Sequence, residues 1–160
     1  MADGEGRNSV FLAKHGFTVD AFDISGAAIV KARRLAAASA VTVNYQLADC
    51  DSFSWKSGSY DGVAAIFVQF ADPALRSRMF ARIIESLKPG GILILQGYTQ
   101  QQLEYRTGGP SNIEHLYTEV MLREAFAQLT ILQLKSYESG LAEGTGHRGR
   151  SALIGLIARR

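Results

Sequence analysis

The sequence is poor in cysteine, in long apolar runs and in excess charge of either sign. Cys50 is the single cysteine of 160 residues, so no disulfide forms within the chain, and a cytoplasmic location fits best. The 17 basic and 15 acidic side chains leave a formal charge of +2, which is too small to predict nucleic acid or an anionic membrane as a partner. The apolar stretch at residues 62–70 is far shorter than a membrane span, and the polar first residues exclude a signal peptide. No metal site is predicted.

The length and the apolar content are those of one globular domain. With 47% apolar residues, the chain can bury a single hydrophobic core, and nothing in its length requires a second one. We therefore expect one domain over residues 1–160.

Helical and strand patterns alternate along the chain. The spacing of apolar residues and the breakers between them predict helices at residues 7–15, 73–87 and 116–129, a further helix after Ser25, and strands at residues 17–23, 41–45, 60–70 and 92–95. Ser25 is expected to cap the second helix, whose apolar face carries Ile29, Ala32, Leu35 and Ala36. The run at residues 60–70 is almost continuously apolar, which is typical of a central strand covered on both faces.

Two apolar segments near the end of the chain, residues 130–137 and 151–158, are joined by a glycine-rich loop and are expected to pair antiparallel. Alternating strands and helices followed by such a hairpin predict a Rossmann-like, doubly wound α/β fold. Its sheet is mostly parallel and has an antiparallel C-terminal hairpin.

A glycine pair, Gly4 and Gly6, directly precedes the first predicted helix. Glycine lets the main chain approach a ligand, and amides at a helix start point at a carboxylate or phosphate. Asp23 ends the next strand about twenty residues later, the position and spacing of an acidic residue that binds ribose hydroxyls. The alternative for Asp23 is a carboxylate that caps the following helix.

The position of this turn predicts an incomplete sheet. In a β-loop-α cofactor site the glycine turn follows the first strand, and here only Met1 and Ala2 precede it. We expect the first strand to be missing and the domain to be truncated at its N-terminus, which leaves a groove between strands 17–23 and 60–70. This predicts either a homodimer formed through strand exchange or a loosened monomer that binds its cofactor poorly.

Two further strand ends supply candidate residues. Asp49 follows strand 41–45 and is placed to accept a hydrogen bond from the exocyclic amine of adenine. Phe67, Val68 and Gln69 close the fourth strand, where they would lie under the reacting end of a cofactor. Simple core packing is an equally open interpretation for Phe67 and Val68.

These features resemble the class I S-adenosylmethionine-dependent methyltransferases over nearly the whole chain. The most specific motif is Leu87-Lys88-Pro89-Gly90-Gly91 before a strand, and Tyr60-Asp61 at the start of the fourth strand also matches. The family's first glycine is Ala2 here. Three segments are similar to the tellurite-resistance methyltransferase group and its small bacterial relatives: Gly4-Glu5-Gly6-Arg7-Asn8, Tyr105-x-Thr107-Gly108-Gly109-Pro110 and Glu143-Gly144-x-x-His147-x-Gly149.

The resemblance implies S-adenosylmethionine as cofactor and methyl transfer to a small-molecule acceptor, for which a soft nucleophile such as a thiol or a chalcogen oxyanion is one option. It implies that residues 2–6 wrap the methionine end, that Asp23 holds the ribose and that Asp49 with Cys50 borders the adenine. The expected cofactor-binding residues are Ala2, Asp3, Gly4, Glu5, Gly6, Arg7, Asn8, Asp23, Ile24, Ser25, Ala48, Asp49, Cys50, Phe67, Val68 and Gln69. The expected catalytic residues, near the acceptor pocket, are Tyr105 and His147.

Several alternatives remain open at the level of the sequence. A soft nucleophile needs no base, whereas a hydroxyl or amine would profit from His147, which fits a solvated loop residue equally well. Cys50 is expected to be a small buried filler. The chain is otherwise a non-catalytic or inactive truncated cofactor-binding fragment, or a nicotinamide-dependent oxidoreductase with Gly4-x-Gly6-x-x-Ser9 as its fingerprint. The Pro-Gly-Gly turn and the terminal antiparallel pair argue against the oxidoreductase.

Overall fold

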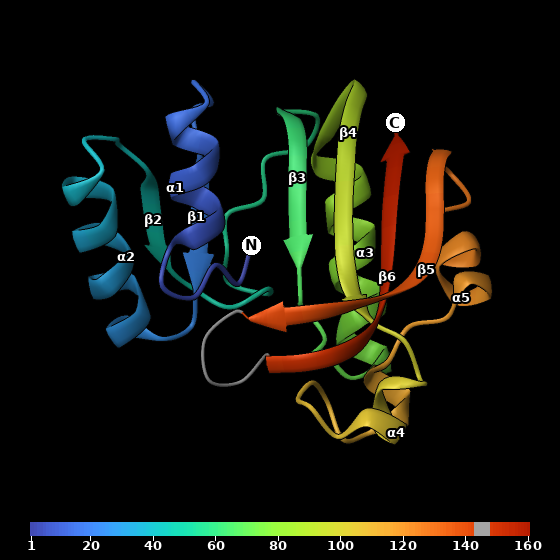
Figure 1. Ribbon diagram of the computed structural model, residues 1–160. Helices are drawn as coiled ribbons and strands as arrows, with labels where there is room; N and C mark the ends of the chain where they lie inside the picture. Colours follow the sequence, from blue (N-terminus) through green and yellow to red (C-terminus); the bar gives the residue numbers. More distant parts are fainter. Residues whose placement is uncertain (143–147) are drawn as a thin grey trace. The chain divides into compact units, whose positions relative to one another are not determined.

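The computed structural model describes residues 1–142 and 148–160, which divide into two compact units, Met1–Ser54 and Trp55–Arg160 (Figure 1). Each unit contains a sheet of its own. The single domain expected over residues 1–160 stays a prediction. In the described parts of the chain, no helix has the length and apolar character needed to cross a bilayer.

The first unit is a parallel βαβ arrangement with one preceding helix. Its elements are α1 (Arg7–Lys14), β1 (Asp20–Asp23), α2 (Gly26–Ala38) and β2 (Asn44–Leu47). The two strands pair in parallel, and α2 packs against both of them and against α1 (Figure 1). Ser25 caps α2 as predicted, because its hydroxyl accepts a hydrogen bond of 3.2 Å from the amide of Ala28.

The core of the first unit combines a stacked pair of phenylalanines with aliphatic side chains. Ala21 and Phe22 are buried on β1, and the Phe22 ring stacks on Phe53 with 4.3 Å between centroids. From α2 the chain buries Ile29, Ala32 and Ala36. Leu35 was expected on the same face but is 37% exposed, because it lies beside the i, i+3, i+7 stripe of those three residues.

The second strand of this unit begins at Asn44, later than the 41–45 segment predicted from the sequence. The preceding residues close helix α2 instead. The amide of Val41 donates to the carbonyl of Ala36 and that of Ala40 to Ala37, a Schellman pattern with Ala40 at a left-handed φ of 54°. The helix cap therefore includes Val41, which was predicted to lie in the strand because the segment 41–45 is rich in β-branched residues.

The second unit is a four-stranded sheet in the order β3-β4-β6-β5. Its strands are β3 (Tyr60–Ile66), β4 (Leu87–Tyr98), β5 (Thr130–Ala142) and β6 (Arg148–Arg159). β3 and β4 are parallel, and β6 runs antiparallel to both β4 and β5, which confirms the predicted terminal hairpin. β3 lies at one end of this order, so the central position predicted for it within the sheet is wrong. A continuous apolar run predicts a strand covered on both faces, whereas in β3 Ala65 is buried and the other residues are exposed or half-buried.

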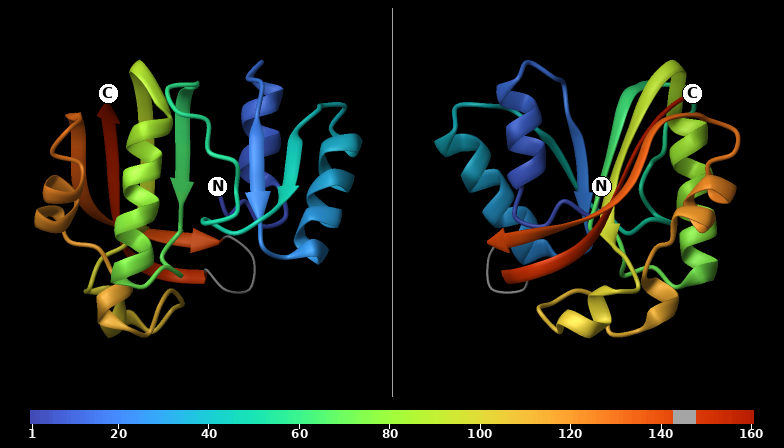
Figure 2. Two further views of the ribbon diagram at one scale, coloured as in Figure 1. Left: turned by 180° about the vertical axis from the view of Figure 1, so that it is seen from behind. Right: turned by 45° about the vertical axis from the view of Figure 1, so that its right-hand side comes forward.

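Two helices cover one face of the four-stranded sheet. Helix α3 (Pro73–Ser86) connects β3 to β4, and α5 (Glu119–Ala125) precedes β5; both lie in front of the sheet in the view from behind (Figure 2). The Phe80 and Phe126 rings meet between them, with centroids 4.6 Å apart. Helix α5 is shorter than the helix predicted at residues 116–129. Its start is set by Thr118, whose hydroxyl accepts a hydrogen bond from the amide of Met121.

The segment between β4 and α5 is irregular. It contains the one-turn helix α4 (Gln102–Tyr105) and the 3₁₀ helix η1 (Ile113–His115). This segment and the loop after β3 together line most of a pocket of the second unit.

Candidate functional site

The glycine turn of the first unit is built from left-handed residues. Gly4 has a φ of 59° and Gly6 a φ of 90°, and Gly6 is the N-cap of α1. Ala2, which occupies the position of the first glycine in the resembled family, also adopts a left-handed φ of 43°. Residues with a Cβ usually avoid this region. The backbone at Ala2 nevertheless has the left-handed conformation that a glycine adopts easily.

The two glycines serve different purposes. A Cβ built on Gly6 would lie 2.8 Å from the Cβ and 2.9 Å from the Cα of Ala32, so the absence of a side chain lets the start of α1 pack on α2. A Cβ on Gly4 would meet no atom within 4 Å. The backbone at Gly4 is therefore open to a ligand, which fits the cofactor expected there.

Asp3 binds the first turn of α1. Its carboxylate accepts hydrogen bonds from the amide of Ser9, at 3.2 Å, and from the Ser9 hydroxyl, at 2.5 Å. The same hydroxyl lies 2.8 Å from that of Tyr45. Burial raises the pKa of Asp3, while the hydrogen bonds from Ser9 oppose that effect. Asp3 thus stabilises the helix start on which the turn depends, a role not predicted from the sequence.

Asp23 connects the glycine turn to the start of α2. One carboxylate oxygen accepts from the amide of Gly4 at 2.8 Å, and the other accepts from the amide of Ser25 at 2.8 Å. A carboxylate has about four acceptor sites, so two remain for ribose hydroxyls. The cap of α2 is Ser25, and Asp23 bonds the amide of that cap residue rather than one in the helix's first turn. The contact of Asp23 with ribose stays a prediction. The neighbouring Ile24 side chain is 76% exposed and offers an apolar surface beside it.

Asp49 follows the neighbouring parallel strand and orders its own loop. Its Oδ1 atom accepts hydrogen bonds from the Ser52 amide (2.7 Å), the Ser52 hydroxyl (2.6 Å) and the Asp51 amide (3.0 Å). These bonds lower the pKa of Asp49, with the Ser52 hydroxyl as the largest cause. The amide of Ala48 donates to the carbonyl of Asp23 at 3.1 Å, so the two strand ends are adjacent.

The other predicted residues of the first unit have simple environments. Cys50 is 3% exposed, which confirms it as a buried filler. Glu5 pairs with Lys31 at 2.6 Å on the surface, and Arg7 and Asn8 are exposed in the first turn of α1. The structure therefore brings the turn, Asp23 and Ala48 together, and their roles toward a cofactor stay predictions.

In the second unit, the residues after β3 are tightly held. Phe67 has a left-handed φ of 53°, which is rare for a bulky residue and typical of functional segments, and its amide donates to the carbonyl of Gln96. Val68 is fully buried. Gln69 is 3% exposed and makes three side-chain hydrogen bonds: its amide group donates to the carbonyls of Tyr98 (2.9 Å) and His115 (3.0 Å), and its Oε1 accepts from the Tyr98 amide (2.6 Å).

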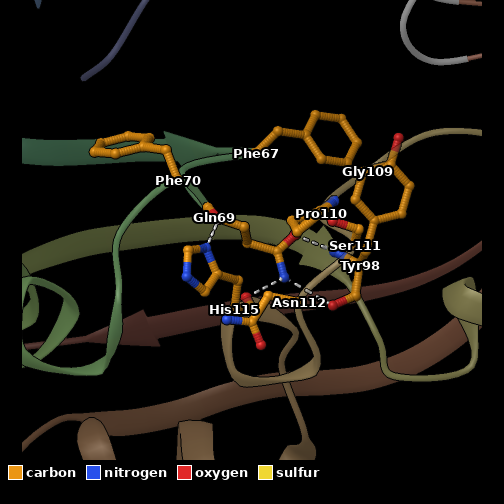
Figure 3. Close-up of a pocket in the computed structure, with 9 residues that line it drawn as sticks. All are labelled: Phe67, Gln69, Phe70, Tyr98, Gly109, Pro110, Ser111, Asn112 and His115. Carbon is orange, nitrogen blue, oxygen red and sulfur yellow. Dashed lines mark hydrogen bonds between the residues drawn. The ribbon is translucent and has the colours of Figure 1, made fainter.

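A pocket of about 470 Å³ lies beside this segment within the second unit (Figure 3). Its lining consists of Phe67, Gln69, Phe70, Tyr98, Gly109, Pro110, Ser111, Asn112 and His115. Sequence reasoning missed His115, although it lies in the same polar segment as the Tyr105 motif. No periodicity distinguishes a lone histidine there from a surface residue.

Of the two predicted catalytic residues, Tyr105 lies in the described part of the chain and His147 does not. Tyr105 donates a hydrogen bond of 2.6 Å to Glu138 on β5, and the Arg150 guanidinium carbon lies 5.1 Å from its ring centroid. The hydrogen bond to Glu138 raises the pKa of Tyr105 and lowers that of Glu138. Tyr105 is not among the residues that line the pocket, and its role stays a prediction. His147 lies outside the described residues.

Within residues 1–142 and 148–160, no three His, Cys, Asp or Glu side chains gather closely enough to hold a metal ion.

Comparison with known proteins identifies the family. A family model described as a methyltransferase domain matches residues 1–91, whereas no curated protein matches the sequence. Among solved structures, TehB from Haemophilus influenzae is 17% identical with a TM-score of 0.78, covering 98% of this chain and 55% of TehB. A SAM-dependent methyltransferase from Methanosarcina mazei is 22% identical with a TM-score of 0.78, covering 99% of this chain and 89% of that one. An S-adenosylmethionine-dependent methyltransferase from Clostridium acetobutylicum is 13% identical with a TM-score of 0.76, covering 99% and 81%.

The chain thus spans about half the length of TehB. At these identities the solved structures show the fold alone, and they confirm the predicted Rossmann-like α/β class. The family model covers more than half of the 160 residues. On that match, and as the resemblance of its motifs predicted, the chain belongs to the methyltransferase domain family.

Proposed function

We propose that this chain is an S-adenosylmethionine-dependent methyltransferase that acts on a small-molecule acceptor. The observation that carries the proposal is the 2.8 Å hydrogen bond from the amide of Gly4 to the carboxylate of Asp23. It joins an open glycine turn to an acidic strand end, the pair of features that a nucleoside cofactor uses for its polar tail and its ribose. The family membership supports the same activity.

Most of the predicted residues of the first unit have a role in this proposal. Residues 2–6 wrap the methionine end, and the amides of Arg7 and Asn8, which no helical carbonyl accepts from, are donors for its carboxylate. Asp23 accepts from the ribose hydroxyls, and the exposed face of Ile24 and the carboxylate of Asp49 border the adenine. The bound cofactor supplies an electrophilic methyl group on a sulfonium. The protein then has to align the acceptor and exclude water.

The experiment is a calorimetric titration of the purified chain with S-adenosylhomocysteine. Replacing Asp23 by Ala removes a charged acceptor, and we expect at least about a tenfold loss of affinity, from about 1.5–3 kcal/mol for a hydrogen bond to a charged group. Asp20→Ala is the matched control, because Asp20 is a carboxylate at the other end of β1. Its affinity should equal that of the wild type.

The outcomes separate the alternatives. Unchanged affinity in a folded Asp23→Ala variant contradicts the ribose assignment. A wild-type chain that does not bind S-adenosylhomocysteine contradicts the proposed activity and favours an inactive fragment that has lost its cofactor affinity. Binding of a nicotinamide dinucleotide in its place would favour the oxidoreductase.

Tyr105 and His147 are proposed to act on the acceptor side. Substituting either residue is expected to lower methyl transfer and to leave the affinity for S-adenosylhomocysteine nearly intact, a distinction that kinetics combined with direct binding resolves. Equal loss of both properties in both variants would contradict this placement. The acceptor itself is either a soft nucleophile, which needs no base, or a hydroxyl or amine, which needs one.

A further inference from the structure

We infer that the pocket beside Gln69 binds neutral, planar aromatic hydroxyl compounds, and that Nε2 of His115 accepts the hydrogen bond of their hydroxyl group. The inference rests on the proposed function, because it names the class of acceptor. It depends on residues of the second unit alone.

The orientation of His115 decides which ring nitrogen is available. Nδ1 lies 3.0 Å from the backbone carbonyl oxygen of Gln69 (Figure 3). A carbonyl oxygen only accepts, so Nδ1 carries the proton and Nε2 of the neutral ring holds a lone pair. Among the described residues, no group hydrogen-bonds to Nε2. The half-buried imidazole thus presents an acceptor at the pocket.

The position of His115 is fixed by its surroundings. Gln69 donates to the carbonyl of His115 from its side chain and accepts from the His115 ring with its own carbonyl. Both contacts come from one buried residue, which also bonds twice to the backbone of Tyr98. The ring therefore has a fixed direction before any ligand binds, which is what a hydrogen-bonding group in a binding site requires.

Flat apolar surfaces form the walls of the pocket. The Phe67 and Tyr98 rings lie at one end with centroids 4.9 Å apart, and Phe70 and His115 lie at the other (Figure 3). Gly109 packs directly on Tyr98, since a Cβ there would lie 2.9 Å from Cδ2 of that ring. Aromatic walls of this kind favour planar ligands, because rings pack by stacking or edge-to-face contact.

The lack of charge in the lining disfavours an ionic acceptor. None of the nine described residues that line the pocket is a lysine, arginine, aspartate or glutamate. A chalcogen oxyanion would lose its hydration without gaining a cation, which is costly, so a neutral ligand is favoured. Among neutral hydroxyl compounds we favour a phenol, because a phenol loses its proton near pH 10, as tyrosine does, whereas an aliphatic alcohol does not.

The proton accounting for such an acceptor is complete. The proton of the acceptor hydroxyl passes to Nε2 of His115, and the acceptor oxygen forms a bond to the methyl carbon. The electron pair of the broken carbon–sulfur bond stays on the cofactor sulfur. No further co-reactant is needed.

The test uses three bicyclic probes of similar size: 2-naphthol, 2-methoxynaphthalene and decahydro-2-naphthol. The first has a flat ring and a hydroxyl, the second lacks the donor and the third lacks the flat ring. The chain has three histidines, so ¹⁵N spectra of the imidazoles resolve His115 once a variant assigns it. We expect 2-naphthol to bind most tightly and to shift the Nε2 signal of His115.

His115→Asn is the informative variant, because the Asn amide can still donate to the Gln69 carbonyl but provides nothing in place of Nε2. We expect it to bind 2-naphthol about threefold to tenfold more weakly and to bind 2-methoxynaphthalene as the wild type does. His15→Asn is the matched control, since His15 lies in the first unit and bonds through Nδ1 to the carbonyl of Phe11. Its affinities should be those of the wild type.

Equal affinities for 2-naphthol and 2-methoxynaphthalene, or an unchanged His115→Asn variant, would overturn the inference. A parallel titration with S-adenosylhomocysteine separates it from the proposed function. A chain that binds S-adenosylhomocysteine but not 2-naphthol refutes the pocket assignment alone. A chain that binds 2-naphthol through His115 but not S-adenosylhomocysteine supports the pocket and contradicts the proposed activity.

Discussion

Gly6 and Gly16 have nearly the same backbone conformation in different surroundings. Their φ angles are 90° and 87°. A Cβ on Gly6 would overlap Ala32, whereas a Cβ on Gly16 would meet no atom within 4 Å. The two positions therefore separate the cost of left-handed backbone from the cost of close packing.

We expect Gly16→Ala to lower the free energy of unfolding by about 1–2 kcal/mol, the cost of a left-handed residue with a Cβ. Gly6→Ala should cost the same amount plus about 1–3 kcal/mol for overpacking against α2. Urea denaturation of both variants measures the difference. Equal losses would mean that the start of α1 does not pack on Ala32 as described.

Asp3 makes stability depend on pH in a predictable direction. Because burial raises its pKa, the folded chain holds this proton to a higher pH than the unfolded chain does, where the pKa is about 3.9. Its contribution to the free energy of unfolding is complete below that value and is lost as the pH rises through the raised pKa of the folded state.

Asp3→Asn removes this titration and keeps groups that can bond to Ser9. We expect the variant to gain stability relative to the wild type as the pH is raised from about 4 toward neutrality. Thermal denaturation of both proteins across that range tests the sign. A difference that does not change with pH would show that the carboxylate is not buried as described.

At the scale of secondary-structure elements, Gln69 connects the segment after β3 to the end of β4 and to η1. Three of its hydrogen bonds are made in a site that is 3% exposed. Removing the side chain leaves buried backbone groups without partners, which costs about 1–3 kcal/mol for each group.

Gln69→Ala is therefore expected to lower the free energy of unfolding by at least about 2 kcal/mol. Gln101→Ala is the control, since Gln101 is exposed and its two side-chain contacts are 3.3 and 3.4 Å long, and it should change stability by less than about 0.5 kcal/mol. Chemical denaturation measures both. Similar effects in the two variants would contradict the connecting role of Gln69.

The sequence predicted these elements where local chemistry decides them. The cap at Ser25, the helix start at Pro73 and the terminal hairpin follow from residue types and periodicity, and all three are observed. The Gln69 contacts were not predictable, because they join residues 29 and 46 positions apart. His115 was missed for the same reason: only its tertiary contact with the Gln69 carbonyl separates it from a surface histidine.

At the scale of the whole molecule, β1 and β3 each stand at the end of their ladder, in the orders β1-β2 and β3-β4-β6-β5. Strands at sheet ends are templates for pairing with another chain. The homodimer through strand exchange predicted from the sequence remains our proposal, with a loosened, weakly binding monomer as the alternative.

We expect the purified chain to have twice its monomer mass in light scattering and a Tm that rises with protein concentration, because dimerisation stabilises the folded state by mass action. The alternative monomer would melt with low cooperativity. A compact monomer that melts cooperatively at a concentration-independent Tm and binds S-adenosylhomocysteine at micromolar levels would contradict both expectations.

The burial of Cys50 makes the reaction rate of its thiol a measure of how often the first unit opens. It is the single thiol of the chain and is 3% exposed, so an aromatic disulfide reagent reacts with it only while that unit is transiently open. The rate of colour release therefore reports the opening equilibrium of Met1–Ser54 without any engineered label. A nucleoside bound at the glycine turn would slow that rate in proportion to its occupancy, so binding can be followed without any methyl acceptor.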